Sequence, residues 1–415
     1  MLAILTTHPI QYQVPLWQRL AADGRVPFEV WYLSEHATRV SRDREFGKEF
    51  AWDIDMLKGY RYRILKTPAG ATPNTFWRSR ITESLPSLLR ETKTKVLWVN
   101  GWQVAAYWQA VWAAHKAGVQ VWMRGESNVL RQQANQRSED RNQKSAIGAA
   151  RQRAKRVLLG QLFKRVDHFL CIGTANRELY CTYGLLESKL HMAMYTVDNE
   201  RFAAQAATLR DQRSEIRGQW GIPEDAYCVL FCGKFIPKKH PIDLVKAAQL
   251  LLASHPELKI HLLFAGSGEL GGELRAACHV VYDAEASQRS APDNRELITD
   301  NAKPRASFTG FLNQTEVSQA YVAADCIILP SDYNETWGLV VNEAMASGLP
   351  CIISDRSGCA PDLGNAGRNA VFSFGNISGL AKGIVELTNR HDSRSQPFKL
   401  PSFSAVVDLV NDLYA

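Results

Sequence analysis

The sequence predicts an α/β protein of two domains, each built around a parallel β-sheet. Short apolar runs rich in β-branched and aromatic residues alternate with helix-length segments along the whole chain. This is the pattern of parallel strands joined by helices. At 415 residues the chain also exceeds what one hydrophobic core usually supports, so two domains of about 200 residues each are expected.

The predicted strands fall into two groups separated by a polar stretch at residues 199–217. The first group is Leu2–Thr7, Phe28–Leu33, Tyr62–Leu65, Val96–Val99, Val119–Met123, His168–Ile172 and His191–Tyr195. The second group is Cys228–Phe231, Ile260–Ala265, Ala306–Thr309, Cys326–Leu329, Cys351–Ser354 and Ala370–Phe374. We place the domain boundary near residue 205, which gives domains of residues 1–205 and 206–395. Residues 396–415 are expected to form a C-terminal helix.

The composition is that of an ordinary globular protein, with 46% hydrophobic and 22% charged residues. No apolar run approaches the ~18 residues of a membrane-spanning helix. The first residues lack the basic region of a signal peptide, so we expect a cytoplasmic protein. The eight cysteines are scattered, with no Cys-x-x-Cys and no histidine at zinc spacing. They predict buried thiols rather than disulfides or a metal site.

Positive charge is concentrated in the first half of the chain. Residues 1–200 hold 29 Lys and Arg against 18 Asp and Glu, whereas the remainder holds 20 against 24. Ten basic residues and only two acidic ones lie in Arg131–Arg165. Two interpretations stay open: a solvated amphipathic helix packed on its own domain, or a surface that docks on anionic lipid at the inner face of the membrane or on a charged acceptor. No nucleic-acid partner is expected.

The strongest candidate site lies between residues 324 and 350. A predicted buried strand, Cys326–Leu329, runs into turn-forming residues and then into a helix that begins near Gly338. Glu335 therefore falls in the loop at the carboxyl end of the strand, and Glu343 falls about two turns into the helix. Ligands of open α/β sheets bind at that edge, and the free N–H groups of a helix start suit a phosphate.

This stretch resembles the donor-site motif of the retaining glycosyltransferases of family 4, the glycosyl transferases group 1, which have the GT-B fold. The shared features are two glutamates separated by seven residues, a helix opening with Gly-Leu, and an Ala-x-Ala-x-Gly-x-Pro end. The resemblance implies that Glu335 contacts the donor sugar's hydroxyls and that Glu343 holds the nucleotide ribose. The implied donor site also includes the residues that follow Glu335, namely Thr336, Trp337, Gly338 and Leu339.

A second element, Gly233 to Lys239, is similar to that family's Gly-[Arg/Lys]-x-x-x-x-Lys element. The resemblance implies that Lys234 and Lys239 hold the donor diphosphate beside Gly233. Since a leaving diphosphate gains negative charge, two fixed cations can stabilise it without a metal. A solvated lysine pair beside a turn is the alternative. A third element, a Gly-x-Gly turn at Gly266, lies near the nucleotide base in that family, although such turns are common.

The first half of the chain resembles the family less closely. Many relatives place a histidine after the strand that ends at Met123, whereas this chain has Arg124 and Glu126 there. Arg124 could neutralise a phosphate or an acceptor charge, and Glu126 could take the proton of an acceptor hydroxyl. A buried structural Arg–Glu pair is the alternative. The family's hinge pattern is matched at Val197-Asp198 but not at Tyr195.

Two other features of the first half bear on the site. His8 lies in the loop after the first strand, where many relatives have a glycine pair that this chain lacks. It could face the cleft or have no role. Asp53-Ile54-Asp55 has the Asp-x-Asp form of metal-binding sites in a different glycosyltransferase fold. We expect no metal there, because that fold's single-domain context is missing.

The resemblance implies a metal-independent, retaining glycosyltransferase with two Rossmann-like domains that face each other across a cleft. The first domain would bind the acceptor and the second the donor, and helix Phe403–Leu413 would cross back onto the first. The donor would be a nucleotide-diphosphate sugar, with a UDP-sugar favoured over a GDP-sugar. The acceptor would be a saccharide or lipid-linked saccharide in polysaccharide or glycoconjugate synthesis. No cofactor is expected. The alternatives are a sugar-nucleotide epimerase on the same fold and a non-catalytic protein that binds polyanions through Arg131–Arg165.

Overall fold

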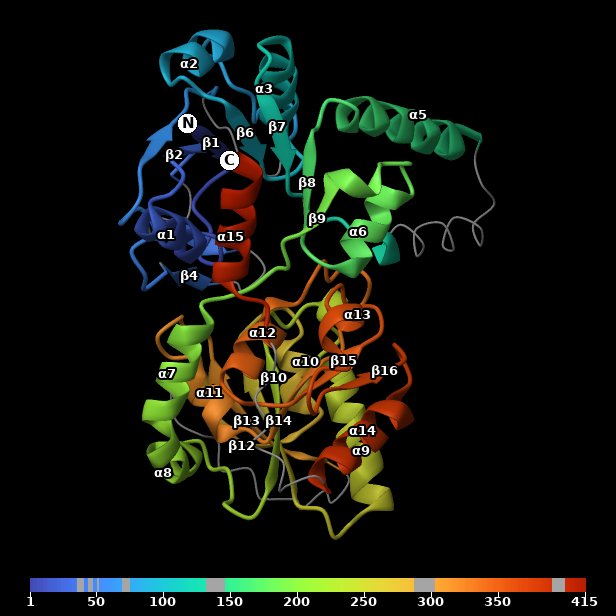
Figure 1. Ribbon diagram of the computed structural model, residues 1–415. Helices are drawn as coiled ribbons and strands as arrows, with labels where there is room; N and C mark the ends of the chain where they lie inside the picture. The colour runs from blue at the N-terminus through green and yellow to red at the C-terminus, as the bar shows by residue number, and fades with distance from the viewer. Residues whose placement is uncertain are drawn as a thin grey trace. The chain divides into compact units, whose positions relative to one another are not determined.

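The computed structural model describes residues 1–35, 41–43, 48–50, 52–68, 75–131, 146–286, 303–389 and 400–415. The chain divides into two compact units (Figure 1). Unit 1 comprises residues 1–41, 54–195 and 401–415, and unit 2 comprises residues 42–53 and 196–400. The main division lies between Tyr195 and Thr196. Residues 42–53 join unit 2 although no sequence pattern indicated it.

Unit 1 is built on a parallel sheet of seven strands in the order β5-β2-β1-β6-β7-β8-β9. The strands are β1 (Leu2–Thr6), β2 (Phe28–Tyr32), β5 (Tyr62–Ile64), β6 (Val96–Val99), β7 (Gln120–Met123), β8 (His168–Cys171) and β9 (Leu190–Met192). The central strands β1, β2 and β6 are buried along their whole length. Continuous apolar runs of this kind are typical of parallel strands covered on both faces.

Unit 1 also contains helices, and all of them except α15 lie between its strands in the chain. They are α1 (Val14–Asp23), α2 (Leu85–Glu91), α3 (Ala105–Lys116), α5 (Ala146–Phe163), α6 (Thr174–Cys181) and α15 (Phe403–Tyr414), with a 3-10 turn η1 (Glu187–Lys189). In α1, the residues Val14, Trp17 and Leu20 recur on one face and are buried. The ring of Trp17 meets Trp98 of β6 edge-on, with the centroids 5.3 Å apart.

Unit 2 repeats this architecture with the strand order β12-β13-β11-β10-β14-β15-β16, again all parallel. The strands are β10 (Tyr227–Cys232), β11 (Ile260–Ala265), β12 (His279–Asp283), β13 (Arg305–Gly310), β14 (Cys326–Leu329), β15 (Cys351–Ser354) and β16 (Ala370–Phe372). In its core, the rings of Phe264 and Phe308 stack with centroids 4.9 Å apart. A separate two-stranded sheet consists of β3 (Ser41–Asp43) and β4 (Lys48–Phe50).

Helices also join the strands of unit 2, and α9 and α14 lie side by side against the sheet (Figure 1). The helices are α7 (Asn199–Leu209), α8 (Arg213–Gln219), α9 (Ile242–Ser254), α10 (Gly271–Ala276), α11 (Ser318–Ala323), α12 (Leu339–Ala346), α13 (Ala360–Leu363) and α14 (Ile377–Thr388). Two 3-10 turns complete the unit, η2 (Arg210–Gln212) and η3 (Pro237–Lys239).

These two seven-stranded, Rossmann-like units confirm the predicted fold class. In unit 1 the strand order reverses at β1, which lies between β2 and β6; in unit 2 it reverses at β10, between β11 and β14. Ligands of such sheets bind beyond the carboxyl ends of the strands at the reversal. The loops after β10 and β14 hold the predicted lysines and Glu335, so these residues lie where a ligand is expected.

One strand of unit 2 is missing from the predicted set. Strand β12 lies at the edge of the sheet, and its side chains are partly or largely exposed. An edge strand needs no continuous apolar run, because fewer of its side chains face a core. Its sequence, which begins at His279 and ends at Asp283, therefore lacks the apolar run on which the prediction depends.

The last helix, α15, belongs to unit 1 and packs on α1. Its buried face consists of Phe403, Val406, Val407, Val410 and Asn411. The side chain of Ser402 caps the helix by accepting a hydrogen bond from the N–H of Ala405, at 3.3 Å.

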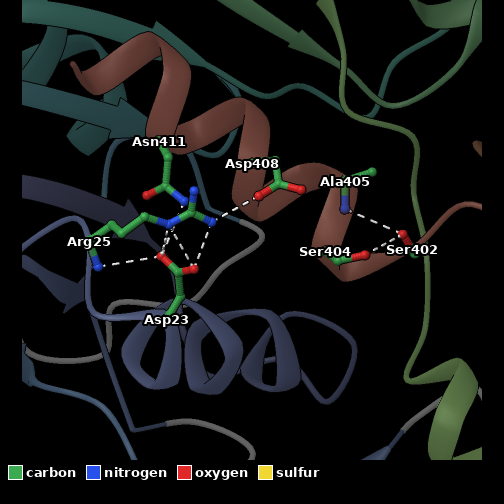
Figure 2. A network of polar contacts seen from close by, with 7 residues as sticks. All are labelled: Asp23, Arg25, Ser402, Ser404, Ala405, Asp408 and Asn411. Carbon is green, nitrogen blue, oxygen red and sulfur yellow. Dashed lines mark hydrogen bonds and ion pairs between the residues drawn. The ribbon is translucent and has the colours of Figure 1, made fainter.

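Polar contacts join α15 to the end of α1 (Figure 2). Arg25 forms ion pairs with Asp23 and Asp408, at 2.7 and 2.8 Å. The amide of Asn411 donates to the Asp23 carboxylate at 3.1 Å. The chain thus returns to unit 1 after completing unit 2.

Candidate active site

The loop after β10 carries the two predicted cations of unit 2. It begins at Gly233, and Lys234 and Lys239 in it are both partly buried. The 3-10 turn η3 holds Lys239, and it ends at His240, which has a left-handed φ of +49°. Such a φ is uncommon for a non-glycine residue. The lysines are thus held on an ordered loop at the end of a buried strand.

The loops after β10 and β11 lie so close together that Gly266 has no room for a side chain. A Cβ atom there would lie 2.0 Å from the carbonyl oxygen of Gly233, and the φ of Gly266 is +139°. Two main-chain hydrogen bonds join the loops, from Gly233 N to Ala265 O and from Phe235 N to Ser267 O, both 2.9 Å long. The Gly-x-Gly turn therefore fixes the course of the lysine loop.

The loop after β14 meets the lysine loop. The N–H of Asp332 donates to the carbonyl of Lys238 at 3.0 Å. The Lys239 ammonium forms an ion pair and hydrogen bond with Oε2 of Glu335. The hydroxyl of Ser331 donates to the same oxygen at 3.2 Å. A lysine and a carboxylate in contact can serve a ligand that has phosphate oxygens and hydroxyls on neighbouring atoms.

Helix α12 begins directly after this loop, at Gly338, whose φ is +105°. Its first backbone N–H groups have no partner within the helix, so they can receive an anion. Glu343, one of its residues, is 3% exposed and accepts a hydrogen bond at Oε2 from the hydroxyl of Tyr321 on α11. Burial, together with the Glu343 carboxylate, raises the pKa of the Cys232 thiol to about 12. Glu343 thus lies beside the end of β10.

The other residues predicted to bind the donor lie at or just before the start of α12. Thr336 and Leu339 are partly buried at the start of α12. Trp337 is 2% exposed, and its indole N–H donates to Oδ1 of Asn342 at 2.8 Å. Trp337 therefore packs inside unit 2 and holds the loop on α12. A direct contact of Trp337 with the donor stays a prediction.

A second polar cluster lies in unit 1, at the carboxyl end of β7. Arg124 is 5% exposed, and its guanidinium carbon lies 4.7 Å from the centroid of the Tyr195 ring. The hydroxyl of Tyr195 donates to Oε1 of the exposed Glu126 at 2.7 Å. Burial lowers the pKa of Arg124, and the nearby Tyr195 and Glu126 oppose this shift. Tyr195 thus links Arg124 and Glu126, in place of the direct pair considered from the sequence.

The segment that carries Arg124 and Glu126 is held by buried side chains. The N–H of Gly125 donates to the hydroxyl of Tyr180 at 3.1 Å. The Asn176 amide donates to the carbonyls of Gly125 and Ser127, at 3.1 and 2.6 Å. A Cβ on Gly125 would lie 2.2 Å from the Trp102 ring. The backbone on both sides of Glu126 is therefore fixed.

Residues after β1 also form polar contacts in unit 1. The hydroxyl of Thr6 donates to Oε1 of Gln13 at 3.4 Å, and the Thr7 hydroxyl lies 2.9 Å from Nδ1 of His8. His8 is thus engaged with its neighbour and is partly buried. Burial raises the pKa of Tyr107, and hydrogen bonds with Thr6 and Thr7 oppose this shift.

Asp53 contacts unit 2 rather than a second acid of the Asp-x-Asp stretch. Its Oδ2 accepts hydrogen bonds from the N–H of Thr315, at 3.0 Å, and from the Thr315 hydroxyl. The neighbouring Trp52 ring lies 6.3 Å from that of Phe311. Among the residues that the structure describes, no group of three or more His, Cys, Asp and Glu side chains is arranged to hold a metal.

The predicted site residues therefore form two clusters, one in each unit. Sequence reasoning missed Ser331 and Tyr321, which bond Glu335 and Glu343, and it noted Tyr195 only as a departure from a family pattern. Ser331 could have been suspected because it lies in the same turn as Glu335. Tyr321 lies on another helix, and no local signal marks it.

The lysine and glutamate cluster lies in a part of the chain with known relatives. Residues 212–397 match the model of the family described as glycosyl transferases group 1. The matched stretch contains Lys234, Lys239, Glu335 and Glu343, which agrees with the resemblance noted in the sequence.

Curated relatives match over part of their length. A D-inositol 3-phosphate glycosyltransferase of Thermomonospora curvata is 30% identical over 178 residues, which are 42% of this chain and 38% of that relative. Another, of Kineococcus radiotolerans, is 29% identical over 257 residues, which are 61% of this chain and 53% of that relative. The chain thus spans about two fifths and about half of these relatives' lengths.

Solved structures resemble the chain over its full length. Anabaena HepE in complex with UDP-glucose has a TM-score of 0.60 at 14% identity, covering 100% of this chain and 98% of that one. A UDP-GlcNAc 2-epimerase of Methanocaldococcus jannaschii has a TM-score of 0.55 at 13% identity, covering 100% and 99%. At such identities the likeness shows the fold alone, which is GT-B. In the described ranges, no helix has the length and apolar character needed to cross a membrane.

Proposed function

We propose that the protein is a glycosyltransferase that moves a sugar from a nucleotide-diphosphate sugar to a hydroxyl of a saccharide or lipid-linked saccharide. The observation that carries the proposal is the contact of Lys239 with Glu335 where the loops after β10 and β14 meet. A bound sugar diphosphate presents phosphate oxygens beside ring hydroxyls, and a lysine next to a carboxylate offers the matching groups. The family match of residues 212–397 supports the same function. We favour a UDP-sugar over a GDP-sugar.

In the proposed complex, Lys234 and Lys239 bind the diphosphate, Glu335 binds the sugar hydroxyls and Glu343 binds the ribose. Lys239 would exchange its contact with Glu335 for the diphosphate, whose charge grows as it leaves. The bond from the anomeric carbon to the diphosphate breaks, and a bond to the acceptor oxygen forms on the same face. The acceptor proton passes to the leaving diphosphate, so the configuration is retained without a metal or a cofactor.

Removing either partner of the Lys239–Glu335 pair tests this proposal. We expect Glu335→Gln and Lys239→Ala each to lower kcat/KM about a hundredfold or more, because each removes a group that stabilises the bound donor. The measurement is nucleoside diphosphate release with a panel of saccharide acceptors, with NMR of the product to establish retention. Lys259→Ala and Glu386→Gln, which alter surface ion pairs of the same unit, are controls that should keep full activity. Full activity of Lys239→Ala would contradict the proposal.

The donor can be identified before the acceptor is known. A nucleotide sugar that binds only the folded protein raises its Tm. UDP-glucose, UDP-N-acetylglucosamine and GDP-mannose therefore form the first panel, in which a UDP-sugar should give the largest shift. Lys239→Ala should lose that shift.

An epimerase is the second candidate, and the fold shared with the UDP-GlcNAc 2-epimerase favours it. The two functions differ in their need for an acceptor. An epimerase isomerises the nucleotide sugar alone, so NMR of a donor-only incubation would show a second sugar. We expect no such product. A non-catalytic polyanion-binding protein would give neither reaction.

We also propose that helix α5 binds an anionic membrane surface. One face of α5 packs on unit 1 through Leu162 and Phe163, which are buried, whereas Val157 and Leu158 are 63% and 58% exposed. The exposed basic residues Arg153 and Lys155 adjoin these two side chains, whereas Arg156 donates to the carbonyl of Thr182. Exposed apolar groups among cations suit anionic lipid. The earlier part of the basic segment, residues 132–145, lies outside the described residues.

Vesicle flotation tests this surface. We expect the protein to float with vesicles of phosphatidylglycerol and phosphatidylcholine, less so in high salt, and not with phosphatidylcholine alone. The double variant Val157→Asp/Leu158→Asp should bind at least about tenfold more weakly, because it removes two apolar side chains that each gain about 1.5–3 kcal/mol on burial. Leu186→Asp, at an exposed leucine of unit 1 that is not part of α5, should bind as the wild type does. An equal loss of vesicle binding in the double variant and in Leu186→Asp would contradict a specific role of α5.

A further inference from the structure

Arg124 is a buried cation of unit 1 whose guanidinium is not fully hydrogen-bonded. Its side chain is 5% exposed, and its Nε has no hydrogen-bond partner. No carboxylate in the described ranges forms an ion pair with it; the face of the Tyr195 ring lies 4.7 Å from its guanidinium carbon, and Glu126 and Tyr180 are close enough to oppose the lowering of its pKa. A guanidinium has five N–H donors, and burying them unsatisfied is unfavourable. The unliganded protein therefore maintains a costly arrangement.

The neighbouring carboxylate does not remove this cost. Glu126 lies two residues away, but its carboxylate is exposed and accepts its hydrogen bond from Tyr195. Tyr195 contacts both groups, Arg124 with its ring face and Glu126 with its hydroxyl. A cation over an aromatic ring gains some attraction, but the ring supplies no acceptor in the guanidinium plane. The Nε–H of Arg124 therefore remains without an acceptor.

The backbone around Arg124 is fixed before any ligand binds. Its own N–H donates to the carbonyl of Val99 at 2.9 Å. The next residue, Gly125, is held by Tyr180 and Asn176, and the Trp102 ring leaves no space for a Cβ there. A preorganised group loses little entropy when it binds a ligand. Arg124 is thus held in place at the carboxyl edge of the sheet, where α/β proteins bind ligands.

We propose that Arg124 binds a phosphate group of a ligand at the carboxyl end of β7 in unit 1. The planar fork of a guanidinium matches two phosphate oxygens at once, and a dianion supplies the charge that the buried cation lacks. The phosphate belongs to the acceptor, which makes the acceptor a phosphorylated molecule. As a part of sugar transfer the site rests on the proposed function, whereas phosphate binding can be measured without any transfer.

The first experiment measures binding of inorganic phosphate at constant ionic strength. It uses the Lys239→Ala protein, because this substitution weakens the other predicted phosphate site. Phosphate should raise the Tm of Lys239→Ala, and adding Arg124→Met should lower the phosphate affinity about tenfold or more, since hydrogen bonds to a charged group are lost. Adding Arg124→Lys should give an intermediate loss, because the charge stays but the fork is gone.

The control and the unliganded Tm exclude a purely structural role. Adding Arg90→Met, which removes an exposed charge on α2, should leave phosphate binding unchanged. Without phosphate, adding Arg124→Met should leave the Tm at or above that of Lys239→Ala, because an unpaired buried charge has been removed. A lower unliganded Tm with an unchanged phosphate shift would overturn the proposal.

A second experiment identifies the source of the phosphate. UDP, glucose 6-phosphate and glucose are titrated into the wild type and Arg124→Met. Weaker binding of glucose 6-phosphate, with UDP and glucose binding unchanged, supports a phosphorylated acceptor, and weaker binding of UDP alone would overturn it. Unchanged binding of both would overturn the site. If phosphate binding depends on Arg124 but no nucleotide sugar supports transfer, the proposed function fails and the phosphate site stands.

Discussion

At the scale of single residues, burial decides the charge state of His261 on β11. The ring is fully buried, and Ser307 lies 2.8 Å from its Nε2. Because the Ser307 hydroxyl donates to the carbonyl of Trp220 at 2.6 Å, it must accept from the Nε2–H of His261. Burial, with the charges of Arg305 and Arg217, lowers the pKa of His261 from 6.5 to about 4. The ring therefore stays neutral in the folded protein down to about pH 4.

The difference in the His261 pKa between the folded and unfolded states predicts that unit 2 loses stability in acid. Unfolding returns the His261 pKa to about 6.5, so the unfolded state binds one more proton than the folded state between pH 6.5 and 4. The contribution to stability is complete above pH 6.5 and is lost as the pH falls, by about 1.4 kcal/mol per pH unit and about 3 kcal/mol in total. Urea unfolding between pH 7.5 and 4.5 should show this slope in the wild type and lack it in His261→Gln. His115→Gln, at an exposed histidine, should keep the slope, and the same slope in all three proteins would contradict the prediction.

Residues of the candidate site differ in how far the sequence could place them. Lys239 and Glu335 follow strands that end at one edge of a parallel sheet, so their proximity was implied by the strand–loop–helix pattern. The hydrogen-bond partners of Glu343 and Glu126 were not implied by any sequence pattern, because Tyr321 lies on α11 and Tyr195 lies 69 positions from Glu126. Such contacts depend on how helices and loops pack around the sheet, which no local pattern reports.

At the scale of elements, the interior strands could be predicted from the sequence. The edge strand β12 and the assignment of residues 42–53 to unit 2 could not. Strands β1, β10 and β14 are continuous apolar runs because helices cover both faces of a parallel sheet. Strand β12 was missed because an edge strand has no such run. Residues 42–53 joined unit 2 unexpectedly: Trp52 contacts Phe311 and Asp53 bonds Thr315, and these contacts follow no periodic sequence pattern.

The Gly-x-Gly turn after β11 shows what structure adds to a weak motif. From the sequence, this turn was a common feature of low specificity. In the structure, the carbonyl of Gly233 occupies the space of a Cβ at Gly266. The glycine is thus required by a neighbouring loop, and that loop holds the lysines proposed to bind the diphosphate. The Gly-x-Gly turn therefore acts indirectly, by setting the position of the loop that carries Lys234 and Lys239.

At the scale of the whole molecule, the chain builds unit 1 from residues at both of its ends. It leaves unit 1 at Tyr195, completes unit 2 and returns for residues 401–415. Helix α15 buries four apolar side chains there, Phe403, Val406, Val407 and Val410. Each gains about 1.5–3 kcal/mol on burial, so their sum is comparable with the 5–15 kcal/mol of net stability of a typical domain.

This topology predicts that α15 stabilises unit 1 alone. Truncation after Leu400 should expose the face of α1 that α15 covers, and the resulting loss of several kcal/mol should unfold unit 1 at much lower temperature. Calorimetry should then show an early transition, and hydrogen exchange should assign it to β1, β2 and β6 while β10, β11 and β14 stay protected.

A single substitution distinguishes apolar packing from the ion pairs in Figure 2. Asp408→Asn breaks the contact of Asp408 with Arg25, in which both side chains are more than half exposed. Exposed ion pairs contribute about 0–1 kcal/mol, so this variant should unfold almost as the wild type does. Val410→Ala should destabilise unit 1 by about 1–3 kcal/mol, because Val410 is fully buried and the shorter side chain leaves a cavity in its place. If Asp408→Asn were the more harmful change, or if truncation lowered both units equally, α15 would not stabilise unit 1 through its apolar face.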